Sequence, residues 1–263
     1  MGTRHVEVVD NHSEQLLLLT MADTPNKQLS IREASPADIP DLTRICLLTA
    51  NAGQSAESMH QYPELLGGLY IEPYLKLSPT FGFVLVDTPE EGKETVLGYL
   101  LAPTFGFVLV DTPEEGKETV LGYLLATPDS RRHEAAAEKE SYPPLRTKYP
   151  NYPYPSDATE RDQGVINRIH KPLIRPQGLV DISPAHIHIN LLPQAQRRGW
   201  GAKLIDEAVR ILKAQGQSAL FVGIDSRNQD ARAFYLRIGF KPFPFPDKEY
   251  LVLHFDDWKG PNP

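Results

Sequence analysis

A short glycine-bearing turn, set between an apolar segment and an amphipathic one, constrains the fold of this chain more than any other feature. The turn is Gln196-Arg197-Arg198-Gly199-Trp200-Gly201; the apolar segment runs from His186 to Leu192 and the amphipathic one from Ala202 to Gln215. This order predicts a strand that enters a tight turn and then opens a helix. Several backbone N–H groups at such a helix start are unpaired and point one way, so the sequence predicts a phosphate or pyrophosphate site.

The spacing around this turn excludes two common phosphate-binding motifs. The Rossmann fingerprint needs a third glycine where this chain has Leu204, and the Walker A motif needs Gly-Lys-Ser/Thr where Gly201 is followed by Ala202. The glycines allow a close approach of the backbone to a ligand, and the two arginines add charge-assisted donors. A phosphate-bearing cofactor of another class is therefore expected.

A second motif, Asn228-Gln-Asp-Ala-Arg-Ala-Phe-Tyr-Leu-Arg-Ile-Gly-Phe240, follows an apolar run from Ser218 to Ile224. The run predicts a buried strand, Asn228 is suited to cap the next helix, and Gly239 is suited to end it. A purely structural interpretation makes Asn228 only a cap and Phe234 a core residue. We accept that interpretation for Phe234, and we favour a functional role for Tyr235 because both motifs occur in one chain.

Together the two motifs resemble the GNAT superfamily of N-acetyltransferases, through Gln/Arg-x-x-Gly-x-Gly and Asn-x-x-Ala-x-x-Phe-Tyr-x-x-x-Gly-Phe. The resemblance implies an α/β (α+β) fold, with a mixed, mostly antiparallel central sheet flanked by helices, and acetyl-CoA as co-substrate. Residues 29–256, apart from a duplicated block, are also similar to the acetyltransferase-like domain of O-GlcNAcase enzymes and its stand-alone microbial relatives. Some members of that subgroup are thought to have lost acetyl-CoA binding, whereas the glycine turn is complete in this chain.

The resemblance also implies roles for individual residues. The backbone of Leu191 and Leu192 would pair with the pantetheine amides, Asn228 and Ala231 would lie along the pantetheine arm, and Tyr235 would protonate the leaving thiolate. The pyrophosphate would be held by the turn and the first residue of the following helix: Gln196, Arg197, Arg198, Gly199, Trp200, Gly201 and Ala202.

The general base is not defined by the sequence. Superfamily members often carry Glu or His at positions that are Ala185 and Ile187 in this chain. His188 is our candidate base, turned inward by a bulge, with His186 and Asp181 nearby. A lone strand histidine is more often structural, and a water relay without a dedicated base is an equal alternative. His186 and His188 lack a clear third ligand, so no metal site is predicted.

Residues 79–102 and 103–126 are identical, each reading PTFGFVLVDTPEEGKETVLGYLLA. Each copy predicts a hairpin, with one strand over 81–86, a turn over 87–92 and a second strand over 95–102 in the numbering of the first copy. A GNAT sheet uses this hairpin once. One copy is therefore expected to be surplus and peripheral, since it would otherwise present an unpaired apolar edge.

The remaining pattern predicts one acetyltransferase-like domain over 28–258, with a disordered leader over 1–27, an insertion over 127–180 and a tail over 259–263. Helices are expected over 36–49, 57–77, 130–142 and 162–170, and closing strands over 239–246 and 248–255. The prolines and tyrosines of 143–157 exclude a regular element there. That segment is either a plain surface loop or an aromatic loop over the acceptor site.

Composition limits the function classes. The 263-residue chain has a net charge of −7 and no Lys/Arg-rich run, which argues against nucleic acid as a partner. No apolar run is long enough to span a membrane. Cys46 is the only cysteine, so a reducing compartment is expected, the cytoplasm first, with a nuclear location left open. The formation of a homodimer is also left open.

Two functions from different classes remain. The first is an acetyl-CoA-dependent N-acetyltransferase that acts by direct transfer on a small-molecule or peptide amine. The second is a catalytically silent acetyltransferase-like binding module. The missing base favours the second function, and the complete glycine turn with Tyr235 favours the first.

Overall fold

The computed structural model describes residues 28–88, 107–110, 118–245 and 249–261. The expected leader over 1–27, the second strand of the first repeat copy over 95–102 and the last residues of the tail lie outside this range. The described strands form an eight-stranded sheet whose main path runs β1-β2-β4-β5-β6-β8-β7, with β3 paired to β4. The bounds are β1 Gln28–Glu33, β2 Phe81–Thr88, β3 Phe107–Val110, β4 Thr119–Thr127, β5 His186–Leu191, β6 Ala219–Ile224, β7 Lys241–Phe243 and β8 Glu249–His254.

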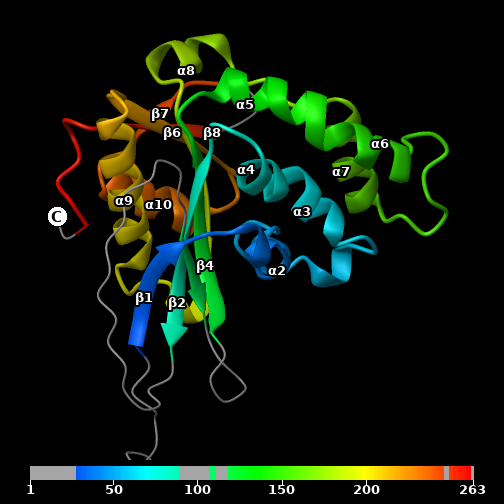
Figure 1. Ribbon diagram of the computed structural model, residues 1–263, viewed down its shortest axis with the longest axis horizontal. Coiled ribbons are helices and arrows are strands. Elements are labelled where there is room, and N and C mark those ends of the chain that lie inside the picture. The colour runs from blue at the N-terminus through cyan, green and yellow to red at the C-terminus, as the bar shows by residue number, and fades with distance from the viewer. Residues whose placement is uncertain (1–27, 89–106, 111–117, 246–248, 262–263) are drawn as a thin grey trace, which may run out of the picture.

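Only β5 and β6 pair in parallel; the other pairs within the described part of the sheet are antiparallel. The helices α9 (Trp200–Ala214) and α10 (Gln229–Arg237) cover one face of the sheet (Figure 1). The other face carries α2 (Ile39–Thr49), α3 (Glu64–Tyr70) and α4 (Glu72–Lys76). The predicted fold class, a mixed and mostly antiparallel sheet flanked by helices, is confirmed.

Side-chain alternation along the central strands separates two parts of the core. On β4, Tyr123 and Leu125 pack with α2, while Leu124 and Ala126 pack with α9 and α10. On β5, Ile187 joins the α9 side. The alternate residues of β5 therefore face α3 and α4, and these are polar.

The two copies of the repeat share one place in the sheet. Phe83 of β2 and Phe107 of β3 both register with Leu124 of β4, and the registers of the two strands agree along the rest of β3. The other edge of β4 pairs with β5 over the same residues, Gly122 to Leu124. One edge of β4 thus serves both copies, so the sheet has room for only one of them. Strand β4 comes from the second copy, and on this edge it pairs with β2 from the first copy and with β3 from the second.

The insertion is more helical than the sequence predicts. It contains α5 (Ser130–Ala136), a π-helical turn (Ala137–Ser141), α6 (Tyr142–Lys148), α7 (Glu160–His170) and α8 (Gln177–Ile182). The expectation of an irregular segment over 143–157 is wrong for its first part. Pro143 and Pro144 lie in the first turn of α6, where a missing N–H costs nothing. Within the described ranges, no helix is both long and apolar enough to cross a membrane.

Candidate active site

The site is a cavity of about 1520 Å³ beside the place where β5 and β6 separate. His186 and Phe221 are the registered pair between these two strands. Beyond this pair both strands continue along the cavity, with His188 to Asn190 on one side and Val222 to Ile224 on the other. Typical pockets for a single small ligand measure roughly 300–1,000 Å³. The cavity is large enough for two ligands side by side.

Backbone groups of β5 face the opening between the two strands. The Leu192 N–H donates to the Leu121 carbonyl of β4 at 2.7 Å. In an antiparallel pair, every second residue of a strand bonds to the neighbouring strand. Because Leu192 bonds to β4, the N–H and C=O groups of Ile189 and Leu191 point to the other edge of β5. The Leu192 N–H, which was expected to pair with pantetheine, is instead bonded to β4, whereas the Ile189 N–H faces the opening. The Leu191 carbonyl already accepts a hydrogen bond from Gln196 Nε2 at 2.8 Å.

His186 is held on all sides by protein groups. Its Nε2 lies 2.8 Å from Arg175 Nη2 and 2.7 Å from Tyr74 Oη, and its Nδ1 lies 2.7 Å from Ser130 Oγ. Arginine only donates, so Nε2 accepts and the proton lies on Nδ1. Burial, and then the charge of Arg175, hold the pKa of His186 well below its usual value. His186 is therefore a neutral structural residue and not a base.

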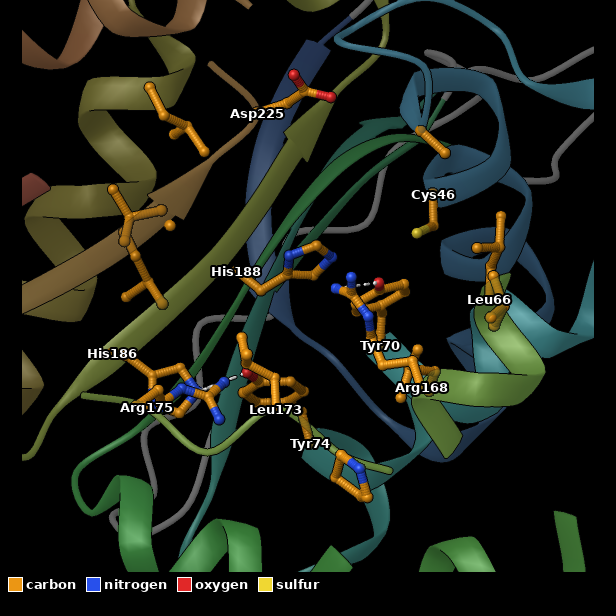
Figure 2. Close-up of a pocket in the computed structure, with 18 of the residues that line it drawn as sticks. Cys46, Leu66, Tyr70, Tyr74, Arg168, Leu173, Arg175, His186, His188 and Asp225 are labelled. Carbon is orange, nitrogen blue, oxygen red and sulfur yellow. Dashed lines mark hydrogen bonds between the residues drawn. The ribbon is translucent and has the colours of Figure 1, made fainter. Parts of the chain in front are cut away.

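His188 belongs to a second polar cluster on the same face of β5. Its Nε2 lies 2.9 Å from Tyr123 Oη, which accepts a hydrogen bond from Asn190 Nδ2 at 2.6 Å. The imidazole stacks against Tyr70, with 5.8 Å between ring centroids (Figure 2). Burial and then Arg175 lower the pKa of His188 to about 4. No bulge is needed to turn it inward, because β5 pairs with β4 without a register shift.

Tyr235 lies in α10 and lines the same cavity. It is 5% exposed, and its ring packs between Phe234 and Phe240. Its hydroxyl makes no hydrogen bond with any described residue. Burial raises the pKa of Tyr235 above its usual value, so the hydroxyl keeps its proton at neutral pH.

Asn228 and Ala231 also line the cavity. Asn228 Oδ1 accepts from the Ala231 N–H at 3.0 Å and caps α10, as the sequence predicts. The Asn228 amide nitrogen lies close to Gly53, in the loop after α2. The cap thus uses Asn228 Oδ1, and Asn228 Nδ2 has no hydrogen-bond partner among the described residues.

The glycine turn lies next to α10 but outside the cavity lining. Gly199 has φ +82° and forms the N-cap of α9 without a side-chain cap. A Cβ on Gly201 would lie 3.0 Å from the Phe234 ring, so a glycine there lets α9 pack against α10. Arg197 forms an exposed ion pair with Asp230 at 3.1 Å, and Arg198 donates weakly to the Gln194 carbonyl. Among the described residues, no side chain makes a capping hydrogen bond at the N-terminal end of α9, where Trp200, Gly201 and Ala202 begin the helix.

Other residues considered in the sequence either lie outside the cavity lining or stay protonated at neutral pH. Asp181 is exposed and bonds to Gln177, outside the cavity lining. Cys46 lines the cavity, and burial raises the pKa of its thiol to about 12, so it stays protonated. Tyr149, Tyr152 and Tyr154 are absent from the cavity lining, which contradicts an aromatic loop over this site.

Sequence reasoning missed the part of the cavity wall that α7 supplies. Arg161, Gly164, Val165 and Arg168 all line the cavity, at the i, i+3, i+4, i+7 spacing of one helix face. That spacing was visible in the sequence, but nothing there indicated which way the face points. Arg175, from the segment after α7, closes the wall and bonds to Glu134.

The fold and the cavity define an α/β protein with a ligand site where two central parallel strands diverge. The Acetyltransferase (GNAT) family profile matches residues 177–240, which include β5, the glycine turn and α10. Over these residues the chain is similar to the GNAT acetyltransferases. The narrower likeness to the O-GlcNAcase acetyltransferase-like domain stays a prediction.

The solved structure of SsHAT has a similar fold, and two further solved structures match at lower TM-scores. SsHAT is 28% identical with a TM-score of 0.67, and the match covers 87% of this chain and 98% of SsHAT. The PaiA N-acetyltransferase from Thermoplasma acidophilum, in complex with coenzyme A, is 12% identical (TM-score 0.44), with 86% of this chain and 99% of that chain covered. YncA from Salmonella typhimurium, with acetyl-CoA, is 14% identical (TM-score 0.41), with 89% and 98% covered.

Proposed function

We propose that the protein is an N-acetyltransferase that uses acetyl-CoA and transfers the acetyl group directly to an amine. The observation that carries this proposal is the buried Tyr235 hydroxyl, which lies free of described partners in the cavity between β5 and β6. The adjoining glycine turn and the open edge of β5 give a cofactor two further places to bind. The similarity of residues 177–240 to the GNAT acetyltransferases supports the same activity.

In the proposed complex, the pyrophosphate binds at the start of α9. The backbone N–H groups of Trp200, Gly201 and Ala202 and the helix dipole would stabilise its charge. The pantetheine arm extends beside β5 and pairs with the N–H and C=O groups of Ile189 and with the Leu191 N–H, since the Leu191 carbonyl is bonded to Gln196. Asn228 lies on the other side of the arm. This arrangement would bring the thioester to the part of the cavity that holds Tyr235 and His188.

The reaction is one displacement. The neutral amine attacks the thioester carbonyl carbon, a C–N bond forms, and the C–S bond breaks. The amine nitrogen loses one proton, and Tyr235 gives one proton to the departing thiolate. Cys46 does not support a covalent acetyl intermediate, because a thiol with a pKa of about 12 is protonated at neutral pH. Direct transfer is therefore the form we propose.

The base stays open between His188 and a water relay. At neutral pH His188 is in the unprotonated form that a base needs, but a pKa of about 4 makes it a weak one. Its Nε2 is also engaged by the Tyr123 hydroxyl. A weak base is sufficient if the acceptor enters the cavity as the free amine, because no ammonium proton then has to be removed before the attack.

The activity is tested by CoA release. The purified chain is mixed with acetyl-CoA and a panel of primary amines, and free thiol is measured together with the acetylated product by mass spectrometry. Equal amounts of thiol and product support transfer. Binding of acetyl-CoA without product from any amine would instead support the silent binding module.

A further inference from the structure

The cationic residues on the cavity wall fall into two groups. Arg131 and Arg175 form ion pairs with Glu134, and Arg146 pairs with Glu138. The second group, which we call the α7 cations, consists of Arg161, Arg168 and Lys171. None of these three forms an ion pair with a carboxylate in the part of the chain that the structure describes. The lining also holds Glu160 and Asp225, and the charge of Arg161 lowers the pKa of Asp225. Six cations against four carboxylates leave the described cavity wall with a formal charge of +2, in a protein whose net charge is −7.

Among the α7 cations, Arg168 has the most defined position. Its Nη1 donates to Tyr70 Oη at 3.3 Å, and the Tyr70 ring stacks on His188. Figure 2 shows the Arg168 side chain extending from α7 towards Tyr70, with His188 beyond it on β5. The remaining N–H groups of the guanidinium have no described partner. A planar guanidinium held in this way is suited to bind an anion with two parallel hydrogen bonds.

The positive charge of the cavity wall favours an anionic ligand group over a cationic one. Arg175 contributes to lowering the pKa values of His133, His186 and His188, so the positive field extends across the side of the cavity next to β5. An ammonium group there loses stability relative to the free amine, whereas an anionic group gains stability.

We propose that the acceptor is an amine that also carries an anionic group, a carboxylate or a phosphate, and that Arg168 binds this group. The inference rests on the proposed acetyl transfer, because it names the class of amine that enters the same cavity. The chemical step is the same as in the proposed function. The amine nitrogen takes the acetyl group, CoA leaves as the thiol, and the anionic group of the acceptor stays bound to the protein throughout.

The first test compares pairs of amines that differ in one group. Phenylalanine and phenylalaninamide test the carboxylate, and O-phosphoethanolamine and ethanolamine test the phosphate. The ratio of kcat/KM for the anionic over the neutral member should be at least tenfold in one pair. In Arg168→Gln this ratio should fall below about twofold. Arg132→Gln, an exposed arginine on α5 outside the cavity lining, should keep the wild-type ratio.

A second measurement does not depend on turnover. Calorimetry in the presence of CoA compares N-acetylphenylalanine with its amide, and N-acetyl-O-phosphoethanolamine with N-acetylethanolamine. Preference for the anionic product in either pair, lost in Arg168→Gln, supports the proposal. Equal affinities in both pairs, or a preference that survives in Arg168→Gln, would overturn it. Failure of the acetyl transfer itself shows separately, as the absence of CoA release with every amine, neutral or anionic.

Discussion

His186 of β5 lies opposite Phe221 of β6, and this pair joins the only two parallel neighbours among the described strands of the sheet. The burial of the His186 ring, bonded to Arg175, Tyr74 and Ser130, fixes this end of the opening. Beyond the pair the two strands line the cavity instead of pairing with each other. The position of the site therefore follows from where the pairing of these strands ends.

Tyr235→Phe should lower kcat by roughly ten- to a thousand-fold if the hydroxyl protonates the leaving thiolate. Acetyl-CoA affinity should barely change, because the ring keeps its packing against Phe234 and Phe240. A fall in kcat with preserved binding marks an interaction made in the transition state. Single-turnover rates and cofactor titrations on the same variant measure both quantities.

The Tm of the Tyr235→Phe variant serves as the control. The hydroxyl has no hydrogen bond among the described residues, so its loss should leave stability nearly unchanged. A structural hydroxyl would instead cost about 1 kcal/mol. Normal turnover together with a lower Tm would reject the acid role of Tyr235.

Deleting residues 103–126 should give a protein at least as stable as the parent. The two copies are identical, so deleting 79–102 gives the same polypeptide. In the shortened chain the β2 sequence leads through Pro89-Glu-Glu-Gly-Lys-Glu94 into the β4 sequence, and one hairpin fills the one available edge. Urea unfolding of both proteins measures the difference. A deletion product that fails to fold, next to a well-behaved parent, would show that both copies are needed.

Lowering the pH from 7 to 5 should destabilise the protein through its buried neutral histidines. Burial lowers the pKa of His133 to about 3, whereas in the unfolded chain it is about 6.5. The unfolded state therefore binds the proton first, and stability present above pH 6.5 is lost as the pH falls towards 3. The slope for one such group is at most about 1.4 kcal/mol per pH unit.

The variant His133→Phe isolates this effect, because a phenyl ring can keep the contact with Tyr74. Its Tm should fall less between pH 7 and pH 5 than that of the parent. His186 and His188 still contribute, so some pH dependence should persist. Parallel curves for the two proteins would mean that His133 does not titrate on unfolding in this range.

Local sequence signals identified the parts of the site that depend on local structure. The glycine turn that opens α9 and Asn228 as the α10 cap were predictable because a turn and a cap are set by neighbouring residues. The role of Leu192 was misassigned because its N–H is committed to β4, a strand far away in the sequence. Pairing between distant strands leaves no local trace that would show which amides stay free.

The insertion shows the same limit. Pro143 and Pro144 were interpreted as helix breakers, yet at the start of α6 they are compatible with a helix. The face of α7 that carries Arg168 was visible as a periodic pattern, but its orientation depends on the packing of Ile166 and Ile169 against α3 and α6. Tertiary packing, and not propensity, brings Arg168 to Tyr70.

Gly199→Glu should abolish acetyl-CoA binding, and Gly199→Gln serves as its matched control. Both side chains impose the same strain at φ +82°, and a Cβ at this position would meet open space. Only glutamate adds a negative charge where the pyrophosphate is expected to bind. The glutamate variant should therefore bind much more weakly than the glutamine variant. Equal affinities would mean that the turn has only a structural role.

The most direct test of the account is isothermal titration calorimetry of acetyl-CoA into the purified full-length chain. The cavity beside β5 and the free start of α9 predict one acetyl-CoA per chain, with desulfo-CoA competing for the same site. Weaker binding in Gly199→Glu than in Gly199→Gln would locate that site at the glycine turn. Absence of binding by the folded wild-type protein would contradict the account.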